Sequence, residues 1–265
     1  MIPLRDRNPT RRFAIVTLGI IAACVGIYFF VQPNGQGGIV QRTADEQVQE
    51  ITWTVEHAAI PCELVEHRPI TVPEVIRTFR DGDTAACQPV PTGPPVDPHK
   101  NIYLAVLYSM FLHGGLLHLG GNMLFLWVFG NNIEDRMGHF GYLLFYLAGG
   151  LAAMAAHVAL QPYSTVPVVG ASGAIAAVMG AYLVLFPNVP ILSIVPVFLF
   201  GLLVEVPAKW LLGFWFVSQF FINPNTGVAW AAHVGGFLFG VMVALLFRDR
   251  LLSQGPAVVL PEGST

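Results

Sequence analysis

A serine between two glycines is the first residue in the sequence whose type and surroundings suggest chemistry. Ser172 lies in Gly170-Ala171-Ser172-Gly173, and Pro167 opposes an earlier helical start. We expect Ser172 at the N-terminus of a helix, where free N–H groups favour a developing negative charge. The same segment is also typical of a helix N-cap or of small-residue helix packing, so alone it indicates catalysis only weakly.

A histidine on a glycine-lined helix face is the second candidate. His233 lies in the segment Ala231–Gly236, and Gly236 and Gly240 follow it at i+3 and i+7, on the same face. These glycines predict close packing against another helix rich in small residues, and the helix that begins near Ser172 is one. A serine hydroxyl needs an adjacent base to attack an amide, and His233 could supply it. A buried histidine can also be a hydrogen-bonded core residue without a catalytic role.

The third group is His113, His118 and Asn122. His118 and Asn122 are four residues apart, so they share one helix face. An imidazole and an amide there could donate hydrogen bonds to an oxyanion. The same residues could instead join helices by hydrogen bonds. Zinc bound by His113, His118 and His233 is a further alternative, but no HExxH-like motif or general-base carboxylate accompanies them, so we predict no metal.

Acidic residues are absent from four of the apolar segments expected to span a membrane: 115–132, 138–160, 170–187 and 230–247. A Ser-His-Asp triad would therefore lack its third member, which leaves a dyad of Ser172 and His233 that needs no cofactor. The same absence argues against a proton transporter driven by carboxylates.

The composition points to a membrane protein. Hydrophobic residues make up 54% of the chain and charged residues 11%, whereas a soluble domain carries about a quarter charged residues. No basic run suggests nucleic acid as a partner. We expect an all-α, polytopic protein with an uncleaved first helix at 13–31. The other predicted spans are 115–132, 138–160, 170–187, 207–222 and 230–247.

The arginines predict the orientation of these six spans. Arginines precede the first span, Arg136 follows the second, and Arg248 and Arg250 follow the last. By the positive-inside rule, residues 1–12 are cytoplasmic and residues 32–114 form a long extracytoplasmic loop. Residues 115–250 hold the other five helices, and residues 251–265 form a disordered tail. Two cysteines of the loop, Cys62 and Cys87, either form a disulfide in an oxidising compartment or remain free.

Taken together, these residues resemble the rhomboid family of intramembrane serine proteases. The matching segments are His113-Gly-Gly-Leu-Leu-His118-Leu-Gly-Gly-Asn122, Gly170-Ala-Ser172-Gly173, Ala231-Ala-His233-Val-Gly-Gly236 and the turn Glu134-Asp135-Arg136. The resemblance implies a bundle of six transmembrane helices with Ser172 as nucleophile and His233 as base. It implies an oxyanion hole of His118, Asn122 and the Ser172 N–H, with His113, Gly170, Gly173 and Gly236 in supporting roles.

The resemblance also implies partners and a location. Substrates would be single-span membrane proteins cut near the outer face of a lipid bilayer, and we expect a multi-pass protein of the bacterial inner or plasma membrane. The sequence departs from the family at two places. Leu104 and Ala105 replace a frequent Trp-Arg pair, and Ala176 replaces an aromatic that often stacks under the catalytic histidine.

Two alternatives remain beside a protease. One is a non-catalytic rhomboid-like protein that binds membrane clients, and the other is a channel or carrier, which would need a polar stripe through several helices. The sequence leaves open the physiological substrate, the cleavage motif, the role of loop 32–100 and the oligomeric state.

Overall fold

The computed structural model describes residues 1–33, 43–197, 200–223 and 228–254 of the chain. Its helices are α1 Ile15–Phe30, α2 Ala44–His57, α3 Pro61–Glu66, α4 Val72–Phe79, α5 Leu104–Ser109, α6 Leu116–Leu160, α7 Ser172–Leu185, α8 Ala208–Ser218, the short 3-10 helix η2 Gln219–Phe221, α9 Trp230–Leu246 and α10 Arg248–Ser253. Its strands are β1 Ile2–Asp6, β2 Pro190–Val197 and β3 Phe200–Pro207. The chain is predominantly helical, as predicted.

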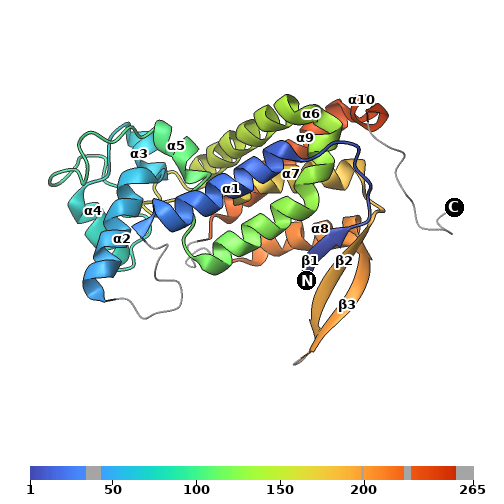
Figure 1. Cartoon of the computed structure of the whole chain (residues 1–265). Coiled ribbons are helices and arrows are strands. Elements are labelled where there is room, and N and C mark those ends of the chain that lie inside the picture. Colours follow the sequence, from blue (N-terminus) through green and yellow to red (C-terminus); the bar gives the residue numbers. More distant parts are fainter. Residues whose placement is uncertain (34–42, 198–199, 224–227, 255–265) are drawn as a thin grey trace.

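The apolar helices α1, α6, α7, α8 and α9 form a bundle, with a loop module at one end and a small sheet at the other (Figure 1). Nearly every residue of α7 is buried, because it packs against α6, α8 and α9. Among the described residues, only α6 is long and apolar enough to qualify as a membrane span by itself, while α1, α7 and α9 are shorter apolar helices.

The long helix α6 consists of two arms that meet at Gly138. This residue has φ 72° and ψ 161°, a conformation that L side chains rarely adopt. Figure 1 shows the second arm folding back along the first. We predicted two spans, 115–132 and 138–160, with a turn at Glu134-Asp135-Arg136, but the helix continues through this turn and breaks only at the glycine.

Acidic side chains explain why the predicted turn is helical. Glu134 is fully buried, and its carboxylate accepts hydrogen bonds from the main-chain N–H groups of Val16 and Thr17 at 2.9 and 2.8 Å. Asp135 accepts from the N–H groups of Arg11 and Arg12 in the same way. The two carboxylates thus satisfy donors at the start of α1, where negative charge is favourable.

A three-stranded antiparallel sheet in the order β1-β2-β3 corrects the all-α prediction. Strand β1 belongs to the N-terminal segment 1–12, and β2 and β3 fill the connection between α7 and α8. Arg7 forms an ion pair with Glu205 on β3. Asp6 is buried, which raises its pKa to about 6 despite hydrogen bonds from Tyr182 and Asn132.

The first long loop is a structured module, defined here as residues 43–112, with four helices. Two of them, α2 and α4, fall where the sequence indicates helices, an amphipathic one over residues 44–59 and a short one over residues 73–79. Both begin with a capping box, at Thr43 and Thr71, which satisfies free N–H groups of their first turns. The sequence left open whether Cys62 and Cys87 are bridged or free. In this structure a disulfide joins them.

Buried ion pairs hold the module together. Arg68 donates to both carboxylate oxygens of Glu74 at 2.9 and 2.6 Å. Lys100 Nζ donates to Glu63 Oε2 at 2.5 Å and to two main-chain carbonyls at the end of α2. At the other end of the chain, we predicted a disordered tail over residues 251–265. Helix α10 extends to Ser253, so the first residues of this segment are helical. Residues 255–265 lie outside the described residues.

Candidate active site

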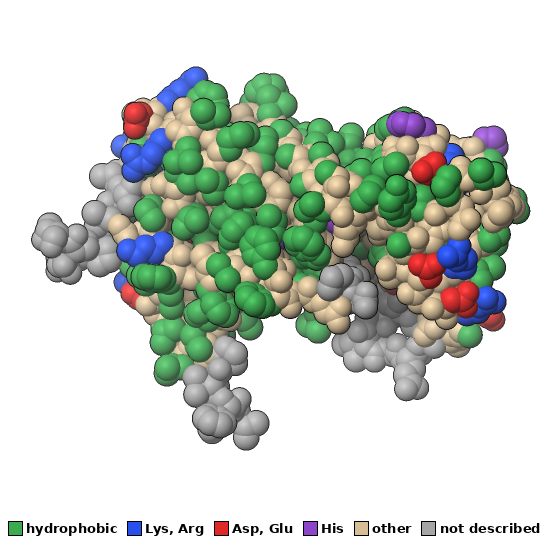
Figure 2. Space-filling model, turned by 180° about the vertical axis from the view of Figure 1, so that it is seen from behind, with side chains coloured by type: hydrophobic (Ala, Val, Ile, Leu, Met, Phe, Trp, Pro, Cys, Tyr) green, Lys and Arg blue, Asp and Glu red, His purple; other side chains and the backbone are tan. Residues whose placement is uncertain are grey.

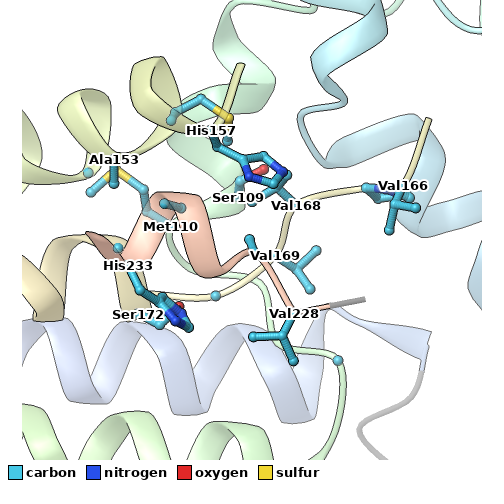
Figure 3. A pocket seen from close by; sticks show the side chains of 18 of the residues that line it. Ser109, Met110, Ala153, His157, Val166, Val168, Val169, Ser172, Val228 and His233 are labelled. Carbon is cyan, nitrogen blue, oxygen red and sulfur yellow. The ribbon is translucent and has the colours of Figure 1, made fainter. Parts of the chain in front are cut away.

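Ser172 and His233 lie within hydrogen-bond distance of each other. Ser172 is the first residue of α7, His233 lies in the first turn of α9, and the distance from Ser172 Oγ to His233 Nε2 is 2.8 Å. Figure 3 shows the two side chains pointing toward one another. An imidazole nitrogen at this distance can take the proton of the hydroxyl when the oxygen attacks a carbonyl.

The pair borders a cavity of about 850 Å³. Ser109, Met110 and His157 line the same cavity opposite the pair, and all five side chains are visible in Figure 3. The cavity also reaches residues 84–85 of the loop module and residues 161–170 of the connection between α6 and α7. Its volume and mainly apolar walls suit an extended stretch of peptide with small side chains.

His118 and Asn122 converge on the main chain just before Ser172. A Cβ atom built on Gly170 would lie 2.9 Å from His118 Nε2 and 3.5 Å from Asn122 Nδ2. Gly170 has φ 122°, so a residue with a side chain would be both strained and crowded there. The glycine therefore lets the chain enter α7 next to both polar groups.

Both side chains have a hydrogen-bond donor left over. The Gly114 N–H donates to His118 Nδ1 at 3.4 Å, which leaves Nε2 to carry the ring proton. Asn122 Nδ2 is buried and has no protein partner in the described part of the chain. The Ser172 N–H lies at the free N-terminus of α7, where the first intrahelical bond begins at Ile175. His118 Nε2 and Asn122 Nδ2 thus lie beside the main chain at Gly170, two residues before the free N–H of Ser172.

His113 lies behind this group rather than in it. Its ring packs edge-on to that of His118, with centroids 5.4 Å apart. Its main-chain N–H and carbonyl form a pair of hydrogen bonds with the side-chain amide of Gln32, at the end of α1, at 2.9 and 3.0 Å. The supporting role of His113 stays a prediction, and Gln32, which sequence reasoning missed, holds its main chain in place.

The zinc alternative finds no support in this geometry. Among the described residues, the histidines His113, His118 and His233 do not bring three ligand nitrogens together. Instead, His118 Nδ1 and both nitrogens of His233 already have protein partners.

Two contacts of His233 were not predicted. Gln219, in η2, places its side-chain oxygen 2.8 Å from His233 Nδ1. Trp215, on α8, places its ring centroid 5.8 Å from that of the imidazole. The aromatic support that Ala176 cannot give therefore comes from another helix. The only signal in the sequence was the spacing of Trp215 and Gln219, which are four residues apart and so share one helix face.

A family model and several known proteins match part of this chain. The Rhomboid domain family model matches residues 100–250, more than half of the chain. The "Rhomboid protease GluP" of Bacillus subtilis is 41% identical over 78 residues, 29% of this chain and 15% of that protein. The "Rhomboid protein 1, mitochondrial" of Saccharomyces cerevisiae is 30% identical over 148 residues, 52% of this chain and 40% of that protein.

The "Presenilin-associated rhomboid-like protein, mitochondrial" of Mus musculus is 31% identical over 148 residues, 51% of this chain and 36% of that protein. The chain thus matches well under half the length of each of these relatives. The family match covers α5 through α9, together with Ser172 and His233. The chain is therefore a member of the rhomboid family of membrane proteins.

Proposed function

We propose that this protein is an intramembrane serine endopeptidase with Ser172 as nucleophile and His233 as general base. One observation carries the proposal: Ser172 Oγ lies 2.8 Å from His233 Nε2 at the wall of a cavity large enough for a peptide. Membership of a family that includes a relative named as a protease supports the same activity.

The reaction follows from the positions of the donors. Ser172 Oγ attacks the scissile carbonyl while its proton moves to His233 Nε2, and the carbonyl oxygen becomes an oxyanion. Asn122 Nδ2, His118 Nε2 and the Ser172 N–H then donate hydrogen bonds to this oxyanion. His233 returns the proton to the leaving amine, and a water molecule, deprotonated by the same nitrogen, hydrolyses the acyl-enzyme.

We further propose six spans with both ends of the chain in the cytoplasm. Counting the two arms of α6 separately, the bundle has six apolar helical segments. Figure 2 shows hydrophobic side chains over its flank and charged side chains toward both ends. Helices α6 and α9 carry exposed apolar residues such as Leu117, Trp127 and Leu238, which suit contact with lipid. The loop module then lies outside, on the side of Ser172.

Under this proposal the substrates are single-span membrane proteins cut near the outer face. Small apolar substrate residues would suit the cavity, whose walls include Ala153, Val168 and Val228 (Figure 3). The relatives include a bacterial protein and mitochondrial proteins. Location in the bacterial plasma membrane therefore stays a prediction for this chain.

The test uses the purified full-length protein. A model single-span substrate should be cleaved, and a serine-directed phosphonate probe should label one peptide, the one that contains Ser172. A reporter fused at residue 70 should read extracytoplasmic. If the protein neither cleaves nor takes the probe, the non-catalytic alternative, a rhomboid-like protein that binds membrane clients, replaces this proposal.

A further inference from the structure

The second ring nitrogen of His233 has a partner from outside the predicted site. His233 Nδ1 lies 2.8 Å from Oε1 of Gln219, a residue only 4% exposed at the end of the α8–η2 segment. The contact joins residues 14 positions apart that come from different elements. Because a buried amide and a buried imidazole each need hydrogen-bond partners, this contact satisfies both.

The other end of the Gln219 amide determines which atom faces the imidazole. Gln219 Nε2 lies 2.9 Å from the main-chain carbonyl of Trp215 and 3.3 Å from Ser218 Oγ. A carbonyl oxygen can only accept a hydrogen bond, so the amide NH₂ must point to it. The amide oxygen is therefore the atom that faces His233.

This orientation determines the tautomer of the histidine. An amide oxygen has no proton to donate, so His233 Nδ1 must carry the ring proton. His233 Nε2 then has a free lone pair directed at Ser172 Oγ, which is the arrangement a general base needs. The opposite tautomer would place two acceptors against each other at Nδ1 and a proton between Nε2 and the serine.

We propose that Gln219 is a positioning residue that holds His233 in its reactive tautomer and orientation. The inference rests on the proposed protease function and extends the dyad to a third, uncharged member. Trp215 assists from the same helix face, four residues earlier, with its ring at 43° to the imidazole. The reacting atoms remain those of Ser172 and His233, and Gln219 acts only through the histidine.

An uncharged partner has a measurable consequence. In a Ser-His-Asp triad the carboxylate both sets the tautomer and stabilises the imidazolium. Gln219 sets the tautomer without adding charge. The titratable groups that face His233 are His118 and His157, from the two arms of α6, and neither is a carboxylate. Replacing Gln219 by a carboxylate of the same shape should therefore change the pH dependence of the reaction.

Three variants of the full-length protein test the proposal. Gln219→Leu removes the acceptor, Gln219→Glu keeps it and adds a charge, and Gln254→Leu makes the same Gln-to-Leu change at an exposed residue after α10, away from the imidazole. For each variant we would measure kcat and KM on the single-span substrate from pH 5 to 9. Detergent melting shows whether the variant is folded.

We expect Gln219→Leu to lower kcat by roughly 10–10³-fold with little change in KM. This loss is smaller than the roughly 10⁴-fold loss in kcat that follows when the histidine of a Ser-His-Asp triad is forced into the wrong tautomer. Gln219→Glu should restore turnover, with the acid limb of its pH profile moved up by roughly 1–3 units, because a carboxylate beside Nδ1–H stabilises the imidazolium. Gln254→Leu should match the wild-type protein.

Other outcomes contradict the proposal. If Gln219→Leu keeps the wild-type rate and pH profile, or if the active Gln219→Glu protein shows an unmoved acid limb, Gln219 serves packing alone. Should Gln219→Leu fail to fold, the Glu profile decides. If the wild-type protein neither cleaves nor takes the phosphonate, the protease proposal fails, and ¹⁵N-histidine NMR still tests the contact. The His233 signal, assigned by its loss in His233→Ala, must then report a proton on Nδ1, and a proton on Nε2 rejects the assignment.

Discussion

Gly236 of α9 presses against the main-chain carbonyl of Gly173 in α7. A Cβ atom added at position 236 would lie 2.1 Å from that oxygen, and one added at Gly240 would lie 1.9 Å from the carbonyl oxygen of Ala177. Such an approach is open only to glycine, so the two helices touch through their backbones. Because Ser172 precedes Gly173 and His233 lies one turn before Gly236, this contact sets the distance between the two reacting side chains.

The first prediction concerns this contact. Gly236→Ala should lower stability by roughly 1–3 kcal/mol, because the added methyl group meets backbone that cannot rotate away. It should also slow phosphonate labelling of Ser172, since parting the helices separates the hydroxyl from the imidazole. Gly213→Ala on α8 is the matched control, as nothing lies within 4 Å of its Cβ position. Equal melting temperatures for the two variants would contradict the prediction.

The oxyanion donors give the second prediction. Asn122→Ala and His118→Ala should each slow cleavage by roughly 10²-fold, the lower end of the range for one lost donor, because the Ser172 N–H remains. The loss should appear in kcat, since the oxyanion exists only along the reaction path. Both proteins should still melt close to the wild-type temperature. Unchanged rates in both would assign the pair to helix packing.

The disulfide of the loop module is the third subject. Cys62 and Cys87 close a loop with a sequence separation of 25, and Cys24 is the one other cysteine of the chain. With Cys24 changed to alanine, thiol labelling after non-reducing denaturation should find no free thiol. Reduction should destabilise the module by roughly 3 kcal/mol through loop entropy. Two free thiols before reduction would refute the pairing.

Glu74 provides a pH prediction for the same module. Burial alone would raise its pKa, but the hydrogen bonds from Arg68, Thr71 and Gln88 outweigh it and lower the pKa to about 2. A depressed carboxyl pKa stabilises the fold above its ordinary value of 4.5, and this stability is lost as pH falls from there toward 2. The protection factors of the α4 amides, which are exchange rates corrected for the intrinsic pH dependence of exchange, should therefore fall across that window.

Glu74→Gln is the control for this pH effect. The amide cannot titrate, so the protection factors of the α4 amides should be lower at neutral pH and should depend less on pH between 4.5 and 2. If the variant keeps the acid sensitivity of the wild-type protein, another group is responsible.

The sequence predicted helix faces and the pairing of Ser172 with His233 across two helices, but it missed contacts made by residues outside the motifs. Gly236 and Gly240 could be placed on the face of His233 because a helix has 3.6 residues per turn. Gln219 could not be placed beside His233, since a chain segment of unknown course separates the two residues. The sheet was missed for the same reason: β1 pairs with β2 across nearly the whole chain, and Ile2 lies opposite Ile194.

The family motif identified the residues Glu134, Asp135 and Arg136 but not the helical structure that they adopt in α6. The Glu134-Asp135-Arg136 segment looked like a turn, because three charged residues between apolar runs are typical of a loop. Its carboxylates instead cap α1, a contact over more than 100 residues that only the folded chain reveals.

The last prediction tests the nucleophile itself. Ser172→Ala should lower cleavage by roughly 10⁴–10⁶-fold and abolish phosphonate labelling, because no other described group stands 2.8 Å from His233 Nε2 in the cavity. Its melting temperature should change little, since the lost hydrogen bond contributes only about 1 kcal/mol. His233→Ala should be as inactive, and the double variant no worse than either single one, because the two side chains act as a unit. Ser109→Ala, which removes a cavity-lining hydroxyl that accepts from the Ala59 N–H and not from the dyad, is the matched control and should still take the probe at Ser172. Cleavage by the Ser172→Ala protein, or a probe that maps to another peptide, would remove Ser172 from the reaction.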